Sequence, residues 1–211
     1  MPTRVSEAFI LRTYPFREAD LIVSFFTREQ GKLRGVARRA RKPKSPFGAG
    51  LERLSHVRMA YFLRENAELA SLSSCETMES GFGVQADYGC SLALDYFTEV
   101  SEHLLPPHEP NEKFFRLLTA MVAHLRAGGE LWSAVDYFTL WAVRLTGVLP
   151  ELRVSDETAA LAEEIFTKPL PSLAGREWNK STLSALRRSL VRAIEQHVER
   201  RMLTVPLLEA L

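Results

Sequence analysis

The first 76 residues contain short apolar runs and segments of alternating polar and apolar residues, the two patterns that predict β-strands. Gly31 precedes one of these segments and can adopt the positive φ of a hairpin loop, and Pro15 is expected to end the first strand. Residues 38–50 hold five basic residues, two prolines and two glycines, which predicts a loop or a very short helix. The predicted strands are residues 8–11, 21–26, 32–37, 57–63 and 69–72. Five short strands suit a small closed barrel, and the OB-fold is a common five-stranded one.

After Glu76 the apolar residues recur every three or four positions, which is the period of an amphipathic helix. Residues 114–125 follow this pattern closely, and Gly128-Gly129 is a typical C-terminal cap. The predicted helices cover residues 90–105, 114–125, 131–145, 155–167 and 183–198. The predicted fold class is therefore α+β. A five-stranded OB-fold barrel over residues 1–78 is followed by an all-helical domain over residues 79–211, with a boundary near residues 76–82.

Charge is distributed unevenly along the chain, although the net charge is only +1. Residues 1–64 contain 14 Lys/Arg and 5 Asp/Glu, whereas residues 65–211 contain 13 Lys/Arg and 21 Asp/Glu. This asymmetry indicates contact with a nucleic acid or a membrane surface, confined to the basic part.

The strongest local signal is a run of seven cations within thirteen residues, with no acidic residue among them. Their mutual repulsion disfavours packing them together unless a polyanion such as DNA compensates. The predicted DNA-binding residues are Lys32, Arg34, Arg38, Arg39, Arg41, Lys42 and Lys44. The nearby aromatic residues Phe47, Tyr61 and Phe62 are candidates for stacking on unpaired bases. The alternatives are a solubilising loop, or a structural loop whose arginines pair with the acidic helical domain.

No catalytic motif is present, since H-E-x-x-H, G-x-S-x-G and Walker loops are all absent. The chain is therefore predicted not to be an enzyme and to need no cofactor. Cys75 and Cys90 are too few and too far apart for a metal site, and we expect both to be small buried hydrophobic residues. Residues 81–86 match the dinucleotide pattern G-x-G-x-x-A, but no returning strand follows, so we interpret them as a link between domains.

The location of the protein is predicted from what the sequence lacks. No run of about 20 apolar residues is present, and the first residues lack the apolar run of a signal peptide. Two cysteines fit a reducing cytoplasm better than a secreted disulfide scaffold. We therefore expect a cytoplasmic protein that does not span a membrane, and of the two surfaces that the charge asymmetry allows we expect contact with nucleic acid and not with a membrane.

Four stretches resemble the RecO family of recombination mediators. Residues 26–33 (FTREQGKL) resemble its F-T-x-x-x-G-[KR] hairpin, and residues 36–45 (VARRARKPKS) resemble its V-A-[KR]-G-A-R-x-x-x-S segment. Residues 8–22 resemble its opening strand and E-x-D turn, and residues 137–152 resemble the helix before its zinc module. Two departures stand out. Arg39 replaces the usual glycine, and no cysteine follows residues 150–152, so the zinc module and its bound zinc are expected to be absent.

The resemblance implies a role in DNA repair and homologous recombination. It implies binding to single- and double-stranded DNA, annealing of complementary strands and, with RecR, help in loading RecA onto DNA coated by the single-stranded-DNA-binding protein (SSB). It also implies contact with the C-terminal tail of SSB and association with the bacterial nucleoid. No residue could be matched to the tail contact; Arg116, Arg126 and Arg144 are candidates.

Two other functions fit the sequence. The chain could be a protein adaptor that uses its acidic helices and the apolar residues 203–208, or an RNA-binding OB module in translation. Residues 203–211 contain four leucines, and we expect this tail to pack onto the body of the protein. Arg187, Arg188 and Arg192 are predicted on the outer face of the last helix.

Overall fold

The computed structural model describes residues 3–64, 67–81, 83–84, 87–149, 154–173 and 179–211. The chain divides into two compact units. The barrel unit contains residues 1–86 together with residues 105–115, and the helical unit contains residues 87–104 and 116–211. A segment beyond the predicted domain boundary at residue 78 thus clusters with the barrel.

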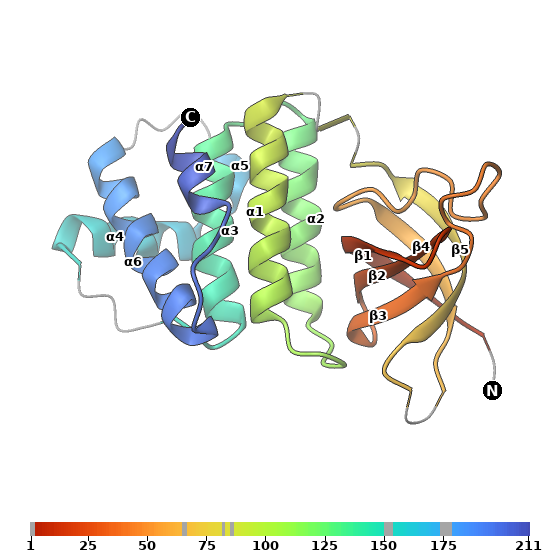
Figure 1. Ribbon diagram of the computed structural model, residues 1–211. Helices are drawn as coiled ribbons and strands as arrows, with labels where there is room; N and C mark the ends of the chain where they lie inside the picture. The colour runs from red at the N-terminus through yellow and green to blue at the C-terminus, as the bar shows by residue number, and fades with distance from the viewer. Residues whose placement is uncertain (1–2, 65–66, 82, 85–86, 150–153, 174–178) are drawn as a thin grey trace. The chain divides into compact units, whose positions relative to one another are not determined.

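Five strands close into a barrel in the order β1-β2-β3-β5-β4 (Figure 1). Neighbouring strands are antiparallel except for β3 and β5, which are parallel. The strands are β1 (Arg4–Phe16), β2 (Asp20–Thr27), β3 (Gly31–Ala37), β4 (His56–Phe62) and β5 (Ala70–Glu79). The predicted OB-fold barrel is confirmed.

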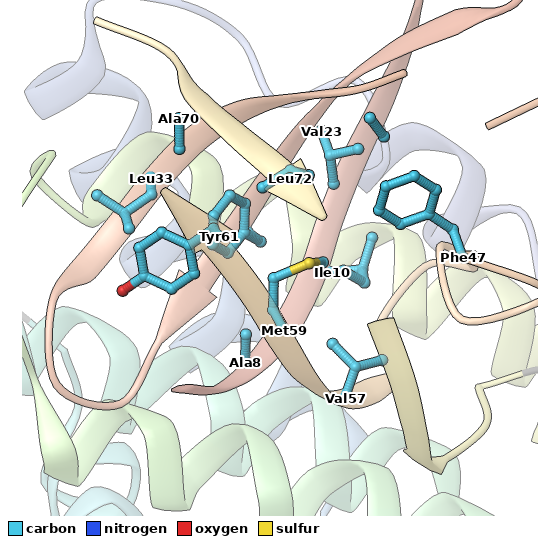
Figure 2. Close-up of a cluster of buried hydrophobic side chains, with 12 residues drawn as sticks. Ala8, Ile10, Val23, Leu33, Phe47, Val57, Met59, Tyr61, Ala70 and Leu72 are labelled. Atoms are coloured by element: carbon cyan, nitrogen blue, oxygen red, sulfur yellow. The ribbon is translucent and has the colours of Figure 1, made fainter. Parts of the chain in front are cut away.

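Alternate residues of the strands fill the barrel interior, as period-two patterning requires. Figure 2 shows this core, in which Ile10, Val23, Leu33 and Met59 converge from four strands. The ring of Tyr61 meets that of Phe25 edge-on, with 5.7 Å between centroids. Closure of the barrel therefore leaves only the outward-facing residues of each strand available to a ligand.

The outward residues Phe9 and Phe26 are also buried, because residues 105–115 cover them. This segment contains the start of α2 (Glu112–Arg126). The Phe115 ring lies 5.0 Å from that of Phe9 and 5.9 Å from that of Phe26, measured between centroids. Arg28 adds an ion pair to Glu112 at 3.2 Å. These contacts explain why this segment belongs to the barrel unit.

Two strands run further than their apolar residues predicted. β1 continues through Pro15 to Phe16, because beyond Phe9 it pairs with β2 alone, and a strand edge tolerates a residue without an N–H. β5 extends to Glu79 although most of its second half is exposed, because its backbone pairs with β4 as far as His56. Backbone pairing with a neighbouring strand thus sets the C-terminal ends of β1 and β5.

The hairpin between β2 and β3 requires glycine at position 31. Gly31 has a φ of 71°, and a Cβ there would collide with the backbone of Glu109. Next to it, the carbonyl of Lys32 accepts a hydrogen bond of 3.0 Å from the N–H of His108. Residues 105–115, called here the covering segment, therefore lie directly on the start of β3.

The five predicted helices are present. Besides α2 they are α1 (Tyr88–Leu104), α3 (Leu131–Leu145), α4 (Asp156–Thr167) and α6 (Lys180–Val198). The short α5 (Leu170–Leu173) and α7 (Val205–Glu209) were not predicted, since four or five residues are too few to show a helical period. Aromatic packing joins α1 to α3, with the Phe97 and Phe138 ring centroids 4.4 Å apart.

Arg187 corrects one expectation about the last helix. Its guanidinium does not lie on an outer face but makes two hydrogen bonds, of 2.6 and 2.9 Å, to the carboxylate of Asp136 on α3. The same group lies 4.0 Å from the centroid of the Trp132 ring. Burial raises the pKa of Asp136, and Arg187 opposes that rise. Arg188 and Arg192 are exposed as predicted.

The C-terminal tail packs onto the helical unit through a buried carboxylate. Glu99 of α1 accepts hydrogen bonds from the N–H groups of Leu203 and Thr204, at 2.7 and 2.9 Å, and from the Thr204 hydroxyl at 2.6 Å. Leu208 is buried. The expected packing is thus found for part of the tail only, since the side chains of Leu203, Leu207 and Leu211 remain exposed.

We predict that Glu99→Ala lowers the free energy of unfolding by about 3 kcal/mol or more, because it leaves buried donors without their charged acceptor. Urea unfolding followed by circular dichroism measures the loss. Glu163→Ala, which removes an exposed carboxylate from α4, is the matched control and should change stability by less than about 0.5 kcal/mol. A Glu99→Ala protein as stable as the control would contradict this role of Glu99.

Candidate nucleic-acid interface

Six of the seven predicted cations are exposed on one strand and the loop that follows it. Residues Leu33, Gly35 and Ala37 of β3 are buried, so the alternate residue Arg34 faces outward. The loop of residues 38–55 then leads to β4. The exposed cations, called here the cation surface, are Arg34, Arg38, Arg39, Arg41, Lys42 and Lys44. The seventh, Lys32, is half-buried beside the covering segment.

Backbone hydrogen bonds to the turn between β1 and β2 fix the first part of this loop. The N–H of Arg39 donates to the carboxylate of Asp20 at 2.8 Å, and the N–H of Arg41 donates to the carbonyl of Ala19 at 3.1 Å. A further bond of 3.0 Å joins the N–H of Lys42 to the carbonyl of Arg39. Asp20 therefore binds the backbone of the loop rather than its guanidinium groups.

The cation surface carries positive charge that the described residues of the barrel unit do not neutralise. Within the described residues of the barrel unit, none of its six side chains lies within 4.0 Å of a carboxylate oxygen. By contrast, Arg28 pairs with Glu7 at 2.8 Å and Arg58 pairs with Glu76 at 3.3 Å. Acidic residues of the barrel unit thus neutralise other arginines and leave this group to solvent or a ligand.

The backbone at Arg39 explains its place in a glycine position. Arg39 has a φ of 57°, in the left-handed region that glycine adopts without cost. A side chain there costs about 1 kcal/mol, and the hydrogen bond from its N–H to Asp20 offsets part of that cost. The departure from the family pattern thus adds a cation at a strained position.

The hairpin of β1 and β2 adds one cation that sequence reasoning missed. Arg17 is exposed on the β1–β2 turn, whose residues Ala19 and Asp20 bind the loop backbone. Its guanidinium lies 5.2 Å from the centroid of the Phe16 ring. Arg17 stands 21 residues before Arg38, so only the strand pairing, in which Leu21 of β2 lies opposite Ala37 of β3, shows that both belong to one end of the barrel.

The expected base-stacking role is wrong for two of the three aromatic residues. Tyr61 is fully buried and Phe47 is 2% exposed, and both belong to the barrel core seen in Figure 2. Phe47 turns inward and fills one part of the interior, so its ring is inaccessible to a base. Phe62 is half-buried, with the guanidinium of Arg64 6.0 Å from its ring centroid.

The two cysteines are half-buried, which is less than predicted, and both are free thiols. Burial raises the pKa of Cys75 to about 11, so this thiol is protonated at neutral pH.

Among the described residues, no group of three His, Cys, Asp or Glu side chains is arranged to hold a metal. Of the motif at residues 81–86, Phe82, Gln85 and Ala86 lie outside the described residues. None of the described helices has the length and apolarity needed to cross a membrane.

The fold defines a class, an OB-fold barrel followed by a helical domain, and comparison with known proteins identifies the family within it. Residues 1–80 match the family model "Recombination protein O N terminal" and residues 85–155 match "Recombination protein O C terminal". The chain belongs to the RecO family of DNA repair proteins.

Several curated relatives bear the name "DNA repair protein RecO". The relative from Koribacter versatilis is 39% identical over 240 aligned positions, which cover 98% of each chain. Since this chain has 211 residues, at least 29 of those positions have no counterpart in it. Relatives from Syntrophus aciditrophicus and Cutibacterium acnes are 28% and 35% identical over 71% and 72% of this chain. This chain spans 58% and 64% of their lengths.

We predict that Arg39→Gly is more stable than Arg39→Ala by about 1 kcal/mol, because only glycine relieves the positive φ. Both variants lose one cation, so both should reduce the salt dependence of DNA binding equally. Urea unfolding compares their stabilities, and oligonucleotide titration at several salt concentrations compares their binding. Equal stability of the two variants would mean that residue 39 does not hold this conformation in solution.

Proposed function

We propose that this protein binds single- and double-stranded DNA through the cation surface and anneals complementary strands. The observation that supports the proposal best is the group of six exposed cations on β3 and the loop of residues 38–55, without carboxylate partners among the described residues of the barrel unit. Phosphates are the natural counter-charge for such a group, and each contact releases a bound counterion.

Annealing follows from charge neutralisation without a covalent step. Two single strands repel each other through their phosphates, and one cationic surface that contacts both lowers this repulsion. Base pairing between the strands then supplies the sequence specificity. The protein would act as a non-enzymatic mediator, and contact with the phosphate backbone accounts for binding both single strands and duplexes.

Family membership supports the remaining parts of the proposal. As a mediator the protein would work with RecR to load RecA onto SSB-coated DNA, in the cytoplasm at the nucleoid, and would bind the SSB tail. Arg116, Arg126 and Arg144 stay candidates for the tail contact, and all three are exposed. The guanidinium of Arg144 lies 4.7 Å from the centroid of the Phe166 ring, which places a cation beside an apolar group.

A protein adaptor is a second candidate function, supported by the exposed side chains of Leu203, Leu207 and Leu211. An adaptor would bind partners through the helical unit and would show no salt-dependent affinity for oligonucleotides. An RNA-binding module would instead prefer RNA to DNA of the same sequence, since the 2′-hydroxyl distinguishes them. Titration with both nucleic acids therefore separates the three functions.

We predict that log affinity for a single strand falls with log salt at a slope of about −3 to −4, if four to six cations contact phosphates at about 0.7 per contact. Replacing Arg38, Arg39, Arg41 and Lys42 with alanine should flatten the slope by roughly two to three units and abolish annealing. Fluorescence titration of one oligonucleotide at several salt concentrations measures the slope, and circular dichroism checks folding.

The matched control removes four exposed cations from the helical unit: Arg188, Arg192, Arg200 and Arg201. This variant loses the same net charge as the loop variant, but its four cations lie outside the cation surface. It should therefore keep both the salt slope and annealing. If the control loses them and the loop variant does not, the DNA-binding surface lies on the helical unit. A loop variant that unfolds would show that the cations are structural.

A further inference from the structure

A hollow of about 350 Å³ lies in the barrel unit between the β1–β2 hairpin and the loop of residues 38–55. Its volume is at the lower end of the range for sites that bind small organic groups. Residues from both sides line it, including Thr13 and Leu21 of the hairpin and Ala40, Ala49, Glu52 and Arg53 of the loop.

The path of the loop backbone explains why this space is open. Phe47 turns into the barrel core, and the residues after it form consecutive turns, with hydrogen bonds from Gly50 N–H to the carbonyl of Phe47 at 2.9 Å and from Glu52 N–H to that of Ala49 at 3.3 Å. The lining residues Ala40 and Ala49 have small side chains. No atom lies within 4 Å of the position that a Cβ would take at Gly48.

The hollow adjoins the cation surface through the chain itself, because its lining residue Ala40 stands between Arg39 and Arg41. A single strand whose phosphates contact these arginines would pass the edge of the hollow with its bases unpaired. Phe47 and Tyr61 are buried, so they offer no stacking surface for those bases.

We propose that the hollow receives one unstacked nucleobase of a bound single strand, an inference that rests on the proposed function. Its lining combines the apolar Leu21 and Leu51 with polar residues, which suits a flat heterocycle with hydrogen-bonding edges. Glu52 offers an acceptor for an exocyclic amino group. Bases with an amino group are therefore favoured over thymine.

The hollow discriminates between single strands and duplexes, whereas the cation surface binds both. A paired and stacked base cannot enter without leaving the duplex, which costs free energy. Filling the hollow should therefore weaken single-strand binding alone. It should leave the salt slope unchanged, because no cation is removed.

The experiment uses the full chain and a thymidine oligonucleotide with one central 2-aminopurine, whose fluorescence rises when it unstacks. Ala49→Leu and Thr13→Ile reduce the hollow from opposite walls. Each should lower single-strand affinity by about fivefold to tenfold, which is the scale of one lost base contact. Each should also abolish the fluorescence rise and leave duplex affinity and the salt slope as in the wild type. Ala127→Leu, at an exposed position after α2, should change none of these.

Two results would overturn the inference and leave the proposed function standing. One is wild-type binding with a normal salt slope but no rise in 2-aminopurine fluorescence. The other is an unchanged ratio of single-strand to duplex affinity in both filled variants. If the wild type shows no salt-dependent binding to any DNA, the proposed function fails and this inference fails with it.

Discussion

The hydrogen bond between the Asp20 carboxylate and the Arg39 N–H is the contact on which the candidate DNA surface depends. Cations crowded into a short loop repel one another, and a loop without fixed backbone contacts would spread them apart. Asp20 and the carbonyl of Ala19 tie the loop to the β1–β2 turn instead. Because the carboxylate binds backbone, the loop is fixed without an ion pair to Asp20.

The rest of the barrel unit is consistent with this arrangement. Closure of the five strands places the β1–β2 turn beside the loop after β3, and the covering segment with Phe115 buries the outward face of β1 and β2 near Phe9 and Phe26. The outer face of β3 at Arg34 and the loop after it stay exposed. The fold therefore separates an apolar outer face, which packs against its own chain, from a charged one.

Much of this could be predicted from the sequence, because period-two and helical patterns are local. The OB-fold and the five longer helices followed from them, and the run from Lys32 to Lys44 identified the cations. What failed depended on contacts between distant residues. The burial of Phe47 and Tyr61 is set by the closed barrel, the inward turn of Arg187 by Asp136 some fifty positions earlier, and the contribution of Arg17 by the hairpin. An aromatic residue near a basic run has the same pattern whether it stacks on a base or fills a core.

Hydrogen–deuterium exchange of the full chain, with and without a single-stranded oligonucleotide, tests most directly whether the cation surface is where DNA binds. The account predicts slower exchange on DNA binding in residues 38–55 and in the β1–β2 turn, with exchange in α4 and α6 unchanged. Slower exchange confined to the helical unit, with residues 38–55 unaffected, would contradict it.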